Sequence, residues 1–124
     1  MVMVTAVTNL GRSGLSDWLV QRVSAVVLLS YTLCIGAFIV QNPSVSYEEW
    51  HALFQGTAMR VFSMLALVSL VIHAWIGLWV VFTDYLTPRM MGAAGNVLRL
   101  TAQALTAIIV FAYLIWGIQI FWGF

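Results

Sequence analysis

A histidine, an aspartate and a tyrosine are the residues of this sequence best placed to do chemistry. His73 lies near the middle of a charge-free apolar stretch, residues 61–83, and Asp84 and Tyr85 follow it directly. An ionisable side chain at such a position in a membrane span is costly to bury, so it usually faces a partner, a cofactor or water. At about 100° and 1.5 Å per residue, Asp84 returns to nearly the same helix face as His73, about 16 Å further along the axis.

His73 has two interpretations at this stage. A neutral imidazole can hydrogen-bond to a neighbouring helix, as polar side chains often do in membranes. Alternatively, it can be the axial ligand of a haem iron, with one ring nitrogen supplying a lone pair and the other oriented by an acceptor. Gly77, one turn further along the same face, leaves a gap over which a flat macrocycle could approach the helix. His51 is a poor second ligand because it lies in a loop beside Glu48 and Glu49, so that ligand would have to come from a partner subunit.

Asp84, Tyr85 and Arg22 also have two interpretations each. Tyrosine commonly anchors a helix end at headgroup depth, and aspartate commonly faces water there. Together with His73 they also suit a quinone site, because a quinone carbonyl needs a hydrogen-bond donor as electrons arrive and a route for protons. Arg22, at the start of the first span, can extend to lipid headgroups. If His73 holds a haem, its guanidinium instead suits a bidentate pair with a propionate.

The composition places these residues in a membrane. The chain has 124 residues, 63% hydrophobic and 7% charged, whereas soluble domains carry about 25% charged residues. Charges are absent from residues 23–47, 61–83 and 100–124, and about 20 apolar residues suffice for one crossing. The sequence therefore predicts an all-α membrane protein, a single transmembrane domain over residues 1–124. Its three helices are expected at approximately residues 18–41, 57–85 and 93–122.

Charge and cysteine content exclude other classes of function. The net charge of +1 is too small for a nucleic-acid partner, since such proteins carry a basic patch. The single cysteine, Cys34, permits neither an intramolecular disulfide nor a multi-cysteine metal motif.

Between the first two spans, Ser46 followed by Glu49 predicts a capping box at the start of a short interfacial helix. Because the spans are apolar and this helix is expected at the membrane surface, membrane lipid is one expected partner.

A family resemblance rests on five segments in order. They are Leu10-Gly11-Arg12-Ser13-Gly14, Asp17 with Arg22, His73-Ala74-Trp75-Ile76-Gly77, Thr83-Asp84-Tyr85, and Pro88. With these segments the chain resembles the hydrophobic membrane anchor of bacterial succinate dehydrogenase (complex II), the smaller of its two haem-anchoring membrane subunits. The resemblance covers nearly the whole chain, and its most specific part is the histidine segment followed at this spacing by Asp84 and Tyr85.

The resemblance implies a role for each matching residue. His73 would be one axial ligand of a haem b shared with a second haem-binding anchor subunit, and Arg22 would face a haem propionate. Tyr85 would hydrogen-bond ubiquinone, and Asp84 would shape that site and its proton supply. FAD and the iron-sulfur clusters would be held only by partner subunits, the flavoprotein subunit and the iron-sulfur subunit, which dock on the cytoplasmic side.

The function implied is that of an anchor that does not oxidise succinate itself. It would serve a succinate:ubiquinone oxidoreductase of the respiratory chain and the tricarboxylic acid cycle, passing electrons from succinate to ubiquinone in a bacterial inner membrane. The alternative from another class is a structural helix-bundle subunit, or a small transporter component, in which His73 only packs and no redox cofactor binds.

The arginines predict the orientation of the chain in the membrane. All five basic residues are arginines; three crossings place Arg12, Arg22, Arg89 and Arg99 on one side and Arg60 on the other. Because the arginine-rich side is usually cytoplasmic, the N-terminus is expected in the cytoplasm and the C-terminus in the periplasm. A C-terminal alkaline phosphatase fusion should therefore be active, and a C-terminal fluorescent fusion that matures only in the cytoplasm should be dark. The opposite pattern would contradict the orientation.

Overall fold

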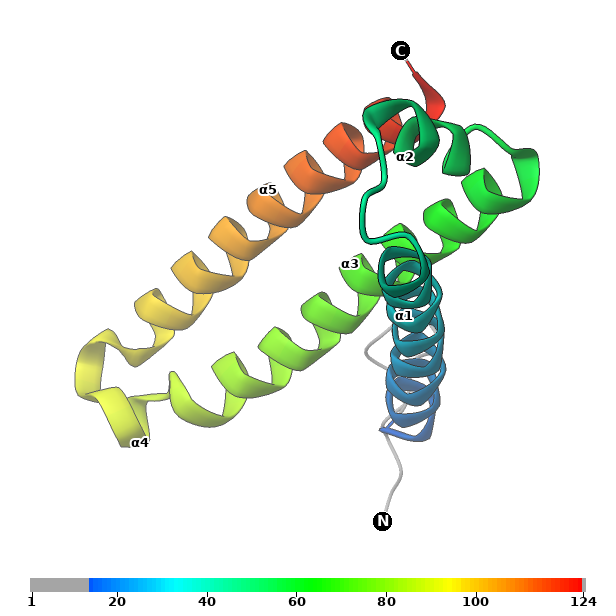
Figure 1. The fold of residues 1–124 in the computed structure, drawn as a ribbon. Helices are drawn as coiled ribbons and strands as arrows, with labels where there is room; N and C mark the ends of the chain where they lie inside the picture. Colours follow the sequence, from blue (N-terminus) through cyan, green and yellow to red (C-terminus); the bar gives the residue numbers. More distant parts are fainter. Residues whose placement is uncertain (1–13, 124) are drawn as a thin grey trace.

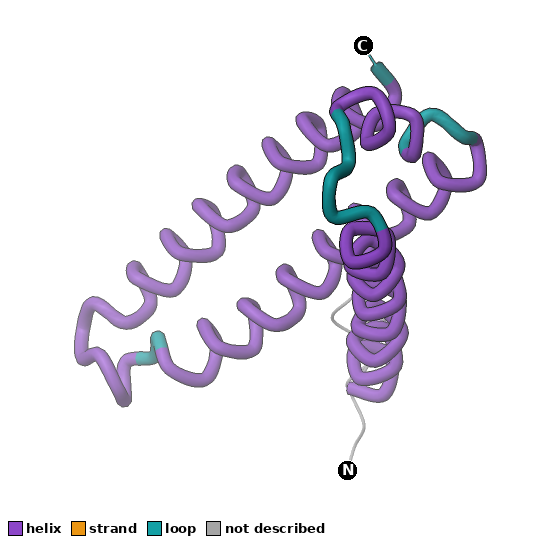
Figure 2. Tube along the Cα trace, viewed as in Figure 1, coloured by secondary structure: helices purple, strands orange, loops and turns teal. Residues whose placement is uncertain are grey.

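The chain is built from helices joined by short connections (Figure 1). The computed structural model describes residues 14–123, and these contain helices and no strand (Figure 2). The long helices are α1 (Gly14–Gln41), α3 (Thr57–Tyr85) and α5 (Gly95–Trp122). The short elements are α2 (Tyr47–Leu53), α4 (Pro88–Met91) and the 3₁₀ helix η2 (Gly92–Ala94).

Within residues 14–123, three helical segments are long and apolar enough to cross a membrane: Gly14–Gln41, Thr57–Tyr85 and Pro88–Trp122. At 1.5 Å per residue, a helix of 28 residues is about 42 Å long, which exceeds the roughly 30 Å of a hydrocarbon core. The predicted all-α membrane fold with three transmembrane helices is therefore confirmed. Two boundaries differ from the expected ones, because α1 begins at Gly14 and not at residue 18, and α5 begins at Gly95 and not at residue 93.

Helix α3 is the central element of the described chain. It packs along α1 and along α5, whereas α1 and α5 do not pack along each other. In Figure 1, α3 and α5 run side by side and are joined through α4, while α1 crosses α3. Helix α2 and the end of α5 lie at the opposite end of the molecule from α4, where the rings of Phe54 and Phe121 are 6.1 Å apart between centroids.

Small side chains let α1 and α3 approach each other closely. Ser63, Ala66 and Ser69 recur every three residues on one side of α3 and are 1%, 5% and 7% exposed. Small residues are typical of helix crossings in membranes, because without bulk between them the backbones can come near. Across this crossing Tyr31 Oη and Ser63 Oγ share a hydrogen bond of 2.6 Å, which fixes one end of the antiparallel register.

The chain has almost no apolar core of its own. Ala66 is the one buried hydrophobic side chain among residues 14–123, while bulky residues such as Leu29, Ile108 and Phe111 are 60% or more exposed. In a soluble protein such a surface would be unstable, but lipid tails and partner helices are as apolar as these side chains. The architecture therefore suits a subunit that packs against lipid and other helices.

The connection between α1 and α3 contains the predicted capping box. Ser46 Oγ accepts from the Glu49 amide at 3.2 Å, and Glu49 Oε2 accepts from the Ser46 amide at 2.8 Å. These two bonds satisfy amide groups that the first turn of a helix leaves without partners. The short helix they begin extends to Leu53.

The connection between α3 and α5 depends on a glycine. Thr87 caps α4 by accepting from the Met90 amide at 3.3 Å, and Pro88 occupies the first turn. A Cβ atom at Gly95 would overlap the backbone of Thr87 and Pro88. Gly92 has φ +73°, a left-handed conformation that favours glycine. The chain can therefore turn back from α3 into α5 only with a residue that lacks a side chain at position 95.

Replacing Gly95 with alanine should destabilise this connection. Because the added methyl meets rigid backbone, we expect a loss of about 1–3 kcal/mol of stability, as in overpacked cores. Thermal unfolding of the detergent-solubilised assembly measures it. Gly36→Ala is the matched control, since that site in α1 is open and alanine is the better helix former. Equal stability of the two variants would contradict the close approach.

Candidate functional site

Helix α1 holds His73 at two points. Ser24 Oγ lies 3.0 Å from His73 Nδ1, and Gln21 Nε2 donates to the backbone carbonyl oxygen of His73 at 3.3 Å. Gln21 and Ser24 are three residues apart and therefore lie on the same side of α1. The imidazole is thus positioned by the α1–α3 crossing, and its ring and its backbone are both anchored.

The second ring nitrogen of His73 has a different environment. Nε2 makes no hydrogen bond to residues 14–123, and the side chain is half-buried within the chain. No group of three or more His, Cys, Asp or Glu side chains that could hold a metal ion occurs in this part of the chain. Within residues 14–123, His73 is therefore not part of a cluster of metal-binding side chains.

Gly77 faces the same helix crossing. A Cβ atom built on Gly77 would lie 3.4 Å from Gln21 Nε2. The gap that the sequence predicts beside His73 is therefore bordered on one side by the Gln21 amide of α1. The close approach of a macrocycle over Gly77 stays a prediction.

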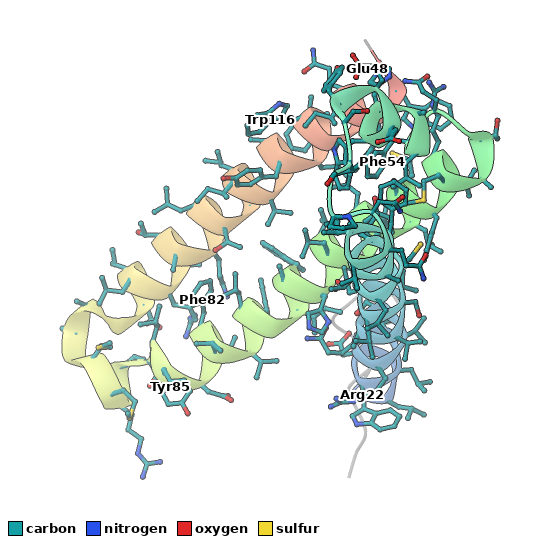
Figure 3. All side chains as sticks on the ribbon, in the orientation of Figure 1. Arg22, Glu48, Phe54, Phe82, Tyr85 and Trp116 are labelled. Atoms are coloured by element: carbon teal, nitrogen blue, oxygen red, sulfur yellow. The ribbon has the colours of Figure 1, made fainter. Side chains whose placement is uncertain are left out.

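Asp84 and Tyr85 lie in the last turn of α3, which ends at the cap residue Leu86. Tyr85 is 58% exposed and Asp84 is also exposed, and neither side chain forms a hydrogen bond with the described residues. In Figure 3, Tyr85 lies at the end of α3 beside the connection to α5, well apart from Arg22 on α1. The phenol and the carboxylate are therefore available to groups outside the chain.

Arg22 is exposed on α1, and its guanidinium carbon lies 5.5 Å from the centre of the Trp18 ring, one turn earlier. Successive residues in a helix are rotated by about 100°, so Arg22 and Ser24, two residues apart, lie on nearly opposite sides of α1. Arg22 therefore points away from the side on which Ser24 meets His73. The structure does not bring Arg22 and His73 together. Arg12, together with the rest of residues 10–13, lies outside the described residues.

His51 lies on α2, away from the crossing that holds His73. Its Nε2 is 3.0 Å from Gln55 Nε2, and its ring stacks on Tyr47 at 5.6 Å between centroids. Helix α2 and helix α4 lie at opposite ends of the molecule (Figure 1).

Two residues of the site, Gln21 and Ser24, are not identified by the sequence reasoning above. A signal for them exists, because Gln21, Ser24 and Tyr31 are polar and share one face of the first span. A polar stripe on one apolar helix predicts a contact with another helix. It does not by itself say which helix.

These features define a small multi-pass membrane protein with a histidine held at the crossing of its first two spans. The chain belongs to the family described as succinate dehydrogenase/fumarate reductase transmembrane subunit, whose model matches residues 5–116. It is 33% identical over 116 residues to the succinate dehydrogenase hydrophobic membrane anchor subunit of Coxiella burnetii (strain RSA 493 / Nine Mile phase I). That match covers 94% of this chain and 95% of the relative. The resemblance to a succinate dehydrogenase membrane anchor subunit is therefore confirmed.

Proposed function

We propose that this membrane anchor subunit helps to bind haem b and ubiquinone, and that it serves the transfer of electrons from succinate to ubiquinone. Its membership of the succinate dehydrogenase/fumarate reductase family supports the anchor role. The observation that carries the haem proposal is that the two nitrogens of the His73 ring differ in their hydrogen bonding. One nitrogen is held by Ser24, and the other has no partner within the described chain.

The residues present fit a haem ligand. A histidine that binds a metal through one nitrogen usually has its other nitrogen hydrogen-bonded, which fixes the orientation of the ring. His73 has this arrangement, with Nδ1 engaged and Nε2 available, in a helix that is apolar enough to cross a membrane. Bound haem would supply a one-electron redox centre. In this proposal the partner anchor subunit would supply a further ligand, and Gly77 would leave room for the macrocycle.

Arg22 has a supporting role in the same proposal. Its exposed guanidinium lies against the Trp18 ring, which leaves its N–H groups able to pair bidentately with a carboxylate. We assign it to a haem propionate. This role requires the propionate to reach the side of α1 that bears Trp18.

Tyr85 and Asp84 form the proposed ubiquinone contact. An exposed phenol in the last turn of α3 can donate a hydrogen bond to a quinone carbonyl as negative charge develops on it. The neighbouring carboxylate of Asp84 can relay a proton from water to that site. Their exposure supports a pocket that is completed by other subunits.

Membership of the family supports the partners in this proposal, and the charge and the surface suggest where they would dock. We place the flavoprotein subunit with its FAD, and the iron-sulfur subunit with its clusters, at the cytoplasmic end that bears Arg22 and Arg89. The exposed apolar faces of α1 and α5 suit the second anchor subunit and the lipid of a bacterial inner membrane. The competing hypothesis, a structural or transport subunit without a redox cofactor, gives His73 no role beyond packing.

Removing the imidazole tests the haem proposal. In the purified complex, His73→Ala should abolish or alter the reduced-minus-oxidised absorbance signal of the b-type haem, because the axial nitrogen is gone. His51→Ala is the matched control, since that ring lies on α2 and should leave the signal intact. A spectrum unchanged by His73→Ala would exclude His73 as the ligand.

Removing one hydroxyl tests the quinone proposal. Tyr85→Phe should lower ubiquinone reduction by on the order of 10²-fold, the usual effect of losing a donor to developing charge. Succinate oxidation with an artificial acceptor should persist, because the peripheral subunits are unchanged. Tyr113→Phe, at a similarly exposed tyrosine on α5, should affect neither rate. Full ubiquinone reduction by Tyr85→Phe would leave Tyr85 as a lipid anchor only.

A further inference from the structure

We propose that Ser24 is a positioning residue that sets the tautomer of His73, and so determines which ring nitrogen is presented to the haem iron. The inference rests on the proposed haem-binding function. It concerns a residue of α1 that need not touch the haem. The observations that carry it are the two hydrogen bonds of one buried hydroxyl.

The direction of these hydrogen bonds can be deduced. The Ser24 hydroxyl lies 3.0 Å from the carbonyl oxygen of Gln21 and 3.0 Å from His73 Nδ1. A carbonyl oxygen can only accept, and a serine hydroxyl has one hydrogen to donate. If Ser24 donates to Gln21, its oxygen can only accept from His73, so Nδ1 must carry the proton. Both bonds are satisfied together only in this arrangement.

The tautomer decides whether the imidazole can ligate. A neutral histidine has one protonated nitrogen and one with a free lone pair. With the proton on Nδ1, the lone pair lies on Nε2, the nitrogen without a partner in the described chain. The other tautomer would put the lone pair on Nδ1, where Ser24 blocks it, and a hydrogen on Nε2. The carbonyl of Gln21 therefore fixes, through Ser24, the nitrogen that is free to bind iron.

Burial makes this arrangement persistent. Ser24 is 4% exposed, and a buried polar group without a partner is costly, so neither hydrogen bond is readily exchanged for water. The Gln21 side chain also holds the His73 backbone at 3.3 Å. One turn of α1 thus limits the rotation of the ring and the movement of α3 at this point.

The same hydrogen bond should affect how tightly haem binds and the midpoint potential of the haem. An acceptor on the protonated nitrogen of a metal-binding histidine raises the basicity of the ligating nitrogen, and a more basic ligand favours ferric over ferrous iron. Loss of the acceptor should therefore weaken haem retention and raise the midpoint potential. If Ser24 served only in helix packing, its loss would change neither the haem affinity nor the midpoint potential.

The experiment compares Ser24→Ala with two variants in the purified complex. Ser24→Ala should weaken haem affinity by about 10–100-fold, the usual effect of removing such a partner, and raise the midpoint potential in a redox titration. Ser24→Thr keeps the hydroxyl and should restore both values. Ser30→Ala is the matched control, because Ser30 also lies on α1 and donates to its own helix, at Val26, on an exposed face. It should behave as wild type.

The outcomes separate this inference from the proposed function. A wild-type complex without a b-type signal would overturn the haem proposal itself. A normal wild-type signal with unchanged haem affinity and potential in Ser24→Ala would overturn only the role of Ser24. If Ser24→Ala does not assemble, Ser24→Cys replaces it, since a thiol is a weak acceptor of similar shape; the same rise in potential supports the inference, and an unchanged potential refutes it.

Discussion

The need to satisfy polar groups where no water is present governs the architecture of this subunit. An imidazole in the middle of an apolar span must find a hydrogen-bond partner within the protein. Here α1 supplies it, through Ser24 to the ring and Gln21 to the backbone. The second polar contact, between Tyr31 and Ser63, lies further along the same crossing. These two contacts fix the position of α1 on α3. Apolar packing alone would specify that position less strictly, because lipid tails can replace apolar side chains.

The rest of the fold is open to its surroundings, for a physical reason. Lipid tails are as apolar as leucine, so a membrane chain gains little by burying its large side chains against one another. Small and polar residues consequently occupy the α1–α3 crossing, while residues such as Ile108 and Phe111 point outward. The chain is thus stable as part of an assembly of helices and not as a self-contained core.

The spans could be predicted from sequence, whereas the neighbours of the candidate site residues could not. Charge-free intervals reveal where a chain can cross a membrane, and the Ser46–Glu49 pair reveals a helix start. The third helix begins at Gly95 and not at residue 93, because hydropathy alone does not detect the short helices that precede Gly95. Helix α1 begins earlier than its apolar run, since its first turn contains the polar Asp17. At the site, periodicity places His73 and Gly77 on one face of α3, yet only the crossing of two helices brings that face to Gln21 and Ser24, about 50 positions away in the chain.

Some polar groups of this helix pair bond within the described residues and others do not, and this difference links the crossing to function. On His73, Nδ1 bonds to Ser24 and Nε2 has no partner within residues 14–123. At the end of α3, the hydroxyl of Tyr85 and the carboxylate of Asp84 likewise have no partner in this part of the chain. The contacts inside the chain therefore orient groups whose chemistry needs another molecule. A membrane anchor subunit whose proposed haem and quinone sites lie between subunits has reason to be built in this way, because such a site is complete only once the subunits have assembled. In the middle of a membrane span, the Nε2 of His73 is costly to leave without a partner, and this cost favours association with a molecule that satisfies it.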